Sequence, residues 1–257
     1  MKEKMSVIFT GHGSPMNAVG ENRARKGWIE MGKRLGKPKA IVALSAHWAT
    51  RGTYVLRVKK NRQIYDMYGF PDELYQIQYA PKGSPELADR VLGLLDGTAK
   101  PANDWGIDHG VWSVLCNMYP DADIPVVIVS TDVTASPEEE YEIGKRLRPL
   151  RDEGVLILAS GNVVHNLRRV NFDQTDGAKW ADDFDTAIRN AITAGDFTVP
   201  VHFKTIPNAK LAVPTADHYY PLLGALGAAD PDTDAVEVWN EYRELGSMSM
   251  TSYLFHA

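Results

Sequence analysis

Val155-Leu156-Ile157-Leu158-Ala159-Ser160 is an apolar run of strand length with no alternating polar residues. Such a run predicts a strand covered on both faces, as in a parallel sheet between two layers of helices. Runs of the same kind occur at residues 7–10, 40–45, 53–58 and 125–130. Segments with helical spacing of apolar residues lie between them, at residues 21–35, 85–95, 110–118, 137–147 and 178–194. This alternation predicts a single-domain α/β fold, in which a mainly parallel central sheet is flanked by helices on both faces.

The composition is that of an ordinary globular chain: 257 residues, of which 44% are hydrophobic and 24% charged. A chain of this length can build its core without disulfides, and no repeat or composition break marks a linker, so we expect one domain over residues 1–257. The single cysteine, Cys116, cannot form an internal disulfide and indicates a reducing compartment. The apolar run at residues 6–10 is too short for a signal peptide or a membrane span, so we expect a cytoplasmic protein.

The net charge of -5 arises from 28 basic and 33 acidic side chains. Nucleic-acid-binding proteins usually carry a basic excess, so this charge argues against a nucleic acid as partner. With no apolar span there is equally no case for a membrane partner, and we expect a small-molecule substrate. The sequence does not fix the oligomeric state, and a monomer is compatible with it.

Histidines follow three of the predicted strands, since His12, His47 and His165 each come shortly after one. The carboxyl ends of parallel strands lie at the same edge of a sheet, where ligands bind, so we expect these side chains to be close in space. Imidazole is the commonest transition-metal ligand and an acid or base near neutral pH. The pattern favours a metal site or proton chemistry over the alternative that each histidine merely closes a loop.

The local settings add two more histidines. His109 follows Asp108, which we expect to cap the helix that begins there. His218 lies in a segment where Thr215 or Asp217 can cap a further helix. His202 and His256 have no such setting, and we expect them at the surface. Two stretches are expected to be irregular, of which the first is long enough to form a loop over a site: residues 59–84 and 197–214.

Six motifs in order along the whole chain resemble the class III extradiol ring-cleaving dioxygenases, in particular the branch that contains the 4,5-DOPA extradiol dioxygenases. The motifs are GHGSPMN at residues 11–17, SAHW at 45–48, DHG at 108–110, SGNVVHN at 160–166, PTADHY at 214–219 and GSMSM at 246–250. Each motif is weak evidence when it stands alone. The set of six in this order makes the resemblance specific.

The resemblance implies roles for the histidines. His12 and His47 correspond to metal ligands, His218 to the third ligand, and His165 to the acid/base residue, which in zinc-bound members is also counted as a ligand. His109 corresponds to a catalytic or substrate-binding histidine. The implied metal is Fe(II) for activity, with Zn(II) an alternative occupant of purified protein.

The third ligand departs from the family's usual pattern, because extradiol enzymes generally use two histidines and one carboxylate. Asp217 is adjacent to His218, but neighbours on a helix point about 100° apart, so only one of them can face the metal well. We prefer His218. Three neutral imidazoles leave the full charge on the ion, which suits a negatively charged catecholate.

The implied function is opening of a DOPA-like catechol ring next to its hydroxyls with O2. His165 would take a catechol proton and later return one. Tyr219, Trp112 and Tyr68 are candidate pocket walls, with ordinary packing as the alternative. Two other functions stay open: a zinc-dependent hydrolase on the same histidines, separated by its independence of O2, and a non-enzymatic metal-binding protein that keeps the fold.

Overall fold

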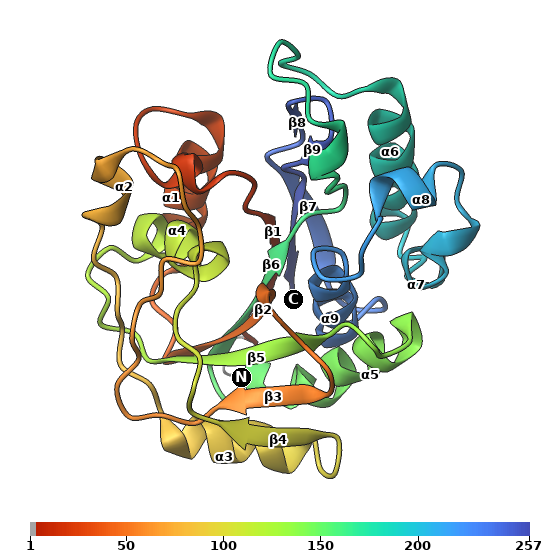
Figure 1. Cartoon of the computed structure of the whole chain (residues 1–257). Helices are drawn as coiled ribbons and strands as arrows, with labels where there is room; N and C mark the ends of the chain where they lie inside the picture. The colour runs from red at the N-terminus through yellow and green to blue at the C-terminus, as the bar shows by residue number, and fades with distance from the viewer. Residues whose placement is uncertain (1–3) are drawn as a thin grey trace.

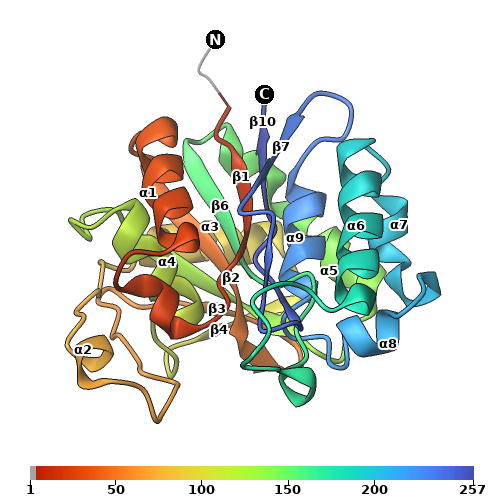
Figure 2. The same cartoon turned by 90° about the horizontal axis from the view of Figure 1, so that it is seen from above.

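The computed structural model describes residues 4–257, in which eight strands form one sheet between two layers of helices (Figures 1 and 2). The sheet order is β4-β3-β5-β2-β6-β1-β10-β7. The strands are β1 (Val7–Gly11), β2 (Ala40–Thr50), β3 (Thr53–Leu56), β4 (Ala99–Ala102), β5 (Val126–Asp132), β6 (Val155–Gly161), β7 (Ala235–Trp239) and β10 (Ser252–His256). A separate two-stranded ribbon pairs β8 (Arg243–Glu244) with β9 (Met248–Ser249).

The four central strands β5, β2, β6 and β1 are parallel to one another. At one side β10 pairs antiparallel with β1 and β7 antiparallel with β10. At the other side β3 pairs antiparallel with β5, and β4 runs parallel to β3. The predicted α/β class with a mainly parallel sheet is therefore confirmed.

The apolar strand residues alternate between two cores, one on each face of the sheet. In β6, for example, Ile157 belongs to one core, whereas Leu156 and Leu158 belong to the other. Helices α5, α6 and α9 cover the first face, and α1 and α4 cover the second (Figure 2). This double cover explains why the strands show no polar alternation.

The predicted helices form close to their expected boundaries. The cap of α5, for example, is a reciprocal pair in which the Ser136 side chain accepts from the Glu139 N–H and the Glu139 carboxylate accepts from the Ser136 N–H. The α-helices are α1 (Arg23–Leu35), α2 (Asp72–Tyr75), α3 (Pro85–Leu94), α4 (His109–Met118), α5 (Pro137–Leu147), α6 (Lys179–Thr193), α7 (Thr198–Val201), α8 (Ala209–Ala212) and α9 (Tyr220–Ala228). Short 3₁₀ turns are η1 (Pro15–Ala18), η2 (Arg148–Arg151), η3 (Leu167–Arg169) and η4 (Phe203–Thr205).

The second strand differs from its prediction. It was expected to end at residue 45, but β2 continues to Thr50 and its register with β5 shifts between Ser45 and Ala49. His47 therefore lies within an irregular part of the strand rather than after it. Strands β4, β7 and β10 were not predicted. Within residues 4–257, every helix falls short of the length and apolarity that a membrane span requires.

Candidate metal centre

Five histidines gather at the carboxyl edge of the central strands. His12 directly follows β1, His47 lies in β2, His165 follows β6, His109 begins α4, and His218 lies in the turn before α9. All five line one cavity of about 410 Å³. The structure thus brings together every histidine that the sequence analysis singled out for function.

Two glycines permit this crowding. A Cβ on Gly161 would lie 2.2 Å from the carbonyl oxygen of His218, so only glycine allows β6 to approach the turn that carries this histidine. A Cβ on Gly110 would lie 2.7 Å from Cδ2 of His47 and 3.4 Å from Cε1 of His12. The start of α4 can therefore lie against the imidazoles only because residue 110 has no side chain.

The rings of His12, His47 and His218 form a nearly equilateral triangle. Their centroids are 4.9 Å apart for His12 and His47, 5.2 Å for His12 and His218, and 5.1 Å for His47 and His218. The Nε2 atoms of His12 and His47 are 3.0 Å apart. Two nitrogens bound to one ion at about 2.1 Å with a right angle between them would also be about 3.0 Å apart, so this pair fits a metal.

The other ring nitrogen of each of these histidines faces an oxygen. Nδ1 of His12 lies 3.0 Å from Oγ of Ser160, Nδ1 of His47 lies 3.0 Å from Oδ2 of Asp66, and Nδ1 of His218 contacts the carboxylate of Asp217. Such partners hold an imidazole in the tautomer whose Nε2 is free to bind a metal. Asp217, expected as a possible helix cap or competing ligand, orients His218 instead.

Ligand atoms gather here in two groups, each within 4.8 Å. One group is His12, His47 and His109, and the other is His165, Asp217 and His218. In the first group Nδ1 of His109 lies 3.0 Å from Oδ2 of Asp66, whose carboxylate it shares with His47. The donor set is rich in imidazole, which suits Fe(II) and Zn(II).

Asp66 is the main site residue that sequence reasoning missed. Its Oδ2 lies 3.0 Å from Nδ1 of both His47 and His109, and its Oδ1 accepts the backbone N–H of His109 at 2.8 Å. Burial favours a raised pKa for Asp66, but the contacts with His109 and His47 prevail and hold that pKa well below its usual range. The available signal was its position in residues 59–84, the segment expected to form a functional loop.

His165 stacks on His218, with ring centroids 3.6 Å apart and planes inclined by 4°. Burial, with the neighbouring His218 as the next cause, lowers the pKa of His165 to about 2. Burial likewise lowers the pKa of His12 and of His218. His47 differs, because its contacts with Asp66 and nearby acids outweigh its burial and raise its pKa. Burial thus favours the neutral imidazole, the form in which histidine binds metals, for His12, His165 and His218.

Asp108 does not cap α4 with its side chain, contrary to expectation. Its carboxylate accepts from Oγ of Ser45 at 2.9 and 2.8 Å and from Nε1 of Trp105 at 3.0 Å. Ser45 lies 63 residues from Asp108 in the chain, so no local pattern could indicate this contact, whereas Trp105 lies within the same short segment as Asp108. Asp108 is fully buried, and burial raises its pKa. Its contacts fix β2 beside the beginning of α4.

The three aromatic residues expected as pocket walls lie elsewhere. Tyr219 is buried in the core, where its hydroxyl donates to the carbonyl of Pro200 at 2.9 Å. Trp112 is also buried and donates to the carbonyl of Ile64. Tyr68 is 92% exposed. None of the three lines the histidine cavity, and Tyr219 and Trp112 have the alternative role of ordinary packing.

The actual wall is apolar and comes from three segments of the chain. It consists of Met67, Phe70, Leu167, Val170, Phe172, Leu245 and Met248. His202 and His256 stay outside the site, as expected: His202 lies 3.6 Å from Glu138, and Nε2 of His256 lies 2.8 Å from Glu237.

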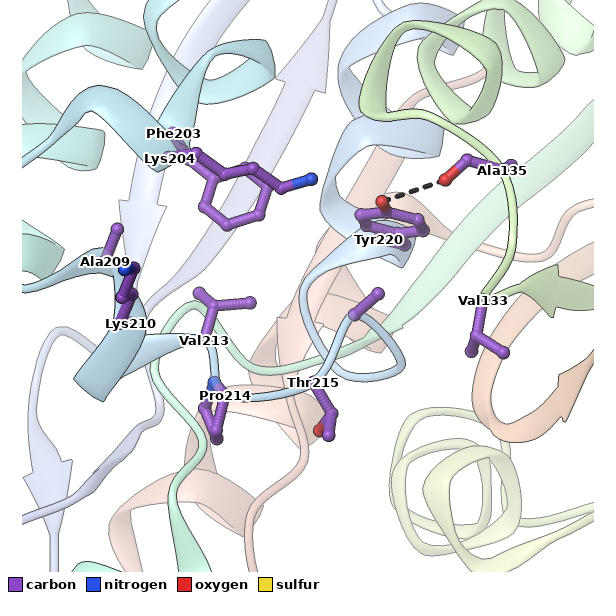
Figure 3. A pocket seen from close by; sticks show the side chains of 11 residues that line it. Val133, Ala135, Phe203, Lys204, Ala209, Lys210, Val213, Pro214, Thr215 and Tyr220 are labelled. Carbon is purple, nitrogen blue, oxygen red and sulfur yellow. Dashed lines mark hydrogen bonds between the residues drawn. The ribbon is translucent and has the colours of Figure 1, made fainter.

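A second hollow, shown in Figure 3, lies between the loop that joins β5 to α5, the helix α8 and the start of α9. It has a volume of about 460 Å³, and its lining includes Phe203, Lys204, Lys210 and Thr215. Tyr220 closes one side by donating to the carbonyl of Ala135 at 3.0 Å. Among the residues that line it there is no histidine, cysteine or carboxylate, so metal chemistry belongs to the histidine cavity.

Comparison with known proteins agrees with the site. A family model described as the catalytic LigB subunit of aromatic ring-opening dioxygenase matches residues 7–256. The 4,5-DOPA dioxygenase extradiol of Escherichia coli (strain K12) is 41% identical over 258 residues, covering 97% of this chain and 94% of that protein. The protein of the same name from Beta vulgaris is 40% identical over 257 residues, covering 97% and 96%. The crystal structure of an uncharacterized protein from Escherichia coli K12 superposes with a TM-score of 0.85 at 37% identity, covering 98% of this chain and 99% of that one.

Proposed function

The chain belongs to the LigB family of aromatic ring-opening dioxygenases, and on that premise we propose that a DOPA-like catechol binds in the histidine cavity. The enzyme is an extradiol dioxygenase, as the resemblance of its six motifs implied. Relatives named for DOPA share about two fifths of their residues with it over nearly the whole chain. This similarity supports the proposed substrate class.

We propose that His12, His47 and His218 hold the metal. The observation that supports this assignment is the arrangement of the three rings, whose centroids are 4.9 to 5.2 Å apart and in each of which Nδ1 faces an oxygen. His109 is the competing third ligand, because its ligand atom lies within 4.8 Å of those of His12 and His47 and its Nδ1 also faces Asp66. We prefer His218 because the resemblance of its motif implies that role. The metal proposed for activity is Fe(II), and Zn(II) is the proposed occupant of protein purified in air. A bound Fe(II) would supply the electron transfer between catechol and dioxygen that imidazole cannot perform.

His165 is the proposed acid/base residue. It lines the cavity and stacks on His218, where it could accept a hydroxyl proton from a bound catechol. The same residue would return that proton to the opened product. His109, at the other side of the cavity, is proposed to bind the substrate, with its ring oriented by Asp66.

Three broader expectations belong to this proposal. The catalytic domain is proposed to extend over residues 1–257, which the family model supports by matching residues 7–256. The net charge of -5 supports a small-molecule partner, with neither nucleic acid nor a membrane involved. The single Cys116 supports a cytoplasmic location.

Oxygen uptake by the Fe(II)-loaded protein, measured over a panel of catechols that includes DOPA, tests the function. We expect one O2 to be consumed for each ring opened, with the Zn(II)-loaded protein inactive because zinc has no redox chemistry. Equal turnover with zinc, or turnover without O2, would favour the hydrolase. Stoichiometric metal binding without turnover of any catechol would favour the non-enzymatic function.

A further inference from the structure

The outer part of the histidine cavity carries no basic side chain. Its wall comes from residues 66–70 on one side and 167–172 on the other, where Met67, Phe70, Leu167, Val170 and Phe172 line the cavity. Among the described residues that line it, none is lysine or arginine. A carboxylate carried on a catechol side chain would therefore find no opposite charge in this wall.

The nearest arginines along the chain, Arg168 and Arg169, do not line the cavity. They belong to the 3₁₀ turn η3, whose geometry of three residues per turn puts Leu167 and Val170 on the same side. Those two residues line the cavity, whereas the two arginines between them are exposed and do not. The turn therefore presents its apolar side to the substrate.

Three carboxylates lie at the cavity or against residues that line it. Asp66 lines it, and Asp217 contacts His218. Oε2 of Glu244 lies 3.0 Å from the point that a Cβ on Gly13, another lining residue, would occupy. These carboxylates disfavour a second anion on the substrate beyond the catecholate that the metal would neutralise.

Two of the wall residues remain largely exposed to solvent, Leu167 at 64% and Phe172 at 84%. Large apolar side chains at the mouth of a cavity gain free energy when a ligand covers them. An apolar substituent on the catechol ring would cover them, whereas a carboxylate at the same place would have to be desolvated without a partner.

We propose that the apolar wall selects the substrate's side chain, so that catechols with an uncharged apolar substituent bind better than catechols whose substituent ends in a carboxylate. This inference rests on the proposed function, since it concerns the substrate of the same site. DOPA would then be held through its catechol ring alone, with its amino-acid end outside the wall. The specificity residues are Leu167, Val170 and Phe172.

The test compares two ligands of equal side-chain length, 4-propylcatechol and 3-(3,4-dihydroxyphenyl)propionate. Their Kd values are measured by titration calorimetry on the Zn(II)-loaded full-length protein, which can bind catechol without turning it over. Their kcat/KM values are measured by oxygen uptake with the Fe(II)-loaded protein. Burying the terminal carbon of the propyl group contributes roughly fourfold to binding. Desolvating the carboxylate of the acid without a partner adds to this difference, so we expect the propyl compound to be favoured about tenfold or more in both measurements.

Variants test whether the apolar wall itself sets the preference between the two ligands. Phe172→Arg and Leu167→Arg each add a cation at an exposed position, so the fold should be kept, and we expect the preference to shift at least tenfold toward the acid. Arg168→Ala is the matched control, because its side chain does not line the cavity, and it should leave the ratio unchanged.

The outcomes separate this inference from the proposed function. If the propyl compound binds more tightly but no oxygen is taken up, the inference about the apolar wall is supported and the proposed dioxygenase function is wrong. Equal or tighter binding of the acid by the unaltered protein would overturn the inference, even if both catechols are cleaved. A selective loss of the acid in Arg168→Ala would also overturn it, because the arginine would then bind the carboxylate.

Discussion

Asp66→Asn tests whether one carboxylate orients both His47 and His109. In the structure Oδ2 serves the two Nδ1 atoms at 3.0 Å, while Oδ1 accepts the His109 N–H at 2.8 Å. Asparagine keeps the shape but has one acceptor and one NH2 group. Whichever way the amide is turned, an N–H of the protein faces the NH2 group.

The expected loss follows from the role of such partners. Removing the group that orients a metal-binding histidine typically weakens metal affinity about 10- to 100-fold, which is roughly 1.4–2.8 kcal/mol. Because His109 loses the same partner, we expect kcat to fall as well, even at saturating metal. The change in affinity reports on His47, and the change in kcat reports on His109.

The affinity is measured by anaerobic competition of Fe(II) and Zn(II) against a coloured chelator, and kcat by oxygen uptake at saturating metal. Glu73→Gln is the matched control, since it removes one negative charge from an exposed position of the same segment. Circular dichroism and the melting temperature of the metal-free protein show whether the fold is kept. Metal affinity and kcat within twofold of the unaltered protein, in a folded Asp66→Asn variant, would refute the reasoning.

Three further predictions concern the site and the core. His218→Ala should lose stoichiometric metal, whereas His165→Gln should keep its metal and lose turnover by about 10²- to 10⁴-fold. Metal analysis of both variants checks this, and equal loss of metal in the two would make His165 a ligand. Gly110→Ala should weaken metal binding at least tenfold in the same chelator competition, because the new Cβ would lie 2.7 Å from Cδ2 of His47. Alanine favours the helix more than glycine does, so the loss would not come from α4 itself. Unchanged metal affinity would contradict the packing argument. Burial raises the pKa of Glu140 from its ordinary value of 4.5 to about 8. Between these two values the folded protein keeps a proton that the unfolded chain releases, so the cost to stability grows as the pH rises from about 4.5 to 8. Glu140→Gln should therefore stabilise the protein against urea by a few kcal/mol at pH 9 and by much less at pH 5, and the idea fails if the two gains are equal.

The hydrogen-bond partners of the site residues show most clearly which features local sequence cannot predict. Ser160 and His12 are 148 residues apart, and Ser45 and Asp108 are 63 apart. Nothing in the neighbourhood of either residue indicates such a contact, because the contact exists only after the strands have paired. The same holds for β10, which enters the sheet beside β1 from the far end of the chain.

Sequence alone determined the layered α/β fold and the place of the site, because both depend on local periodicity and on one topological rule. Apolar runs such as residues 155–160 must be covered on both faces, and parallel strands deliver the residues after them to a common edge. Tertiary structure decided which nitrogen of each histidine faces inward, why Asp66 rather than Tyr219 belongs to the site, and which residues of the turn at 167–170 line the cavity. Those features depend on distances between side chains from separate elements, and only the packing of these elements against one another sets such distances.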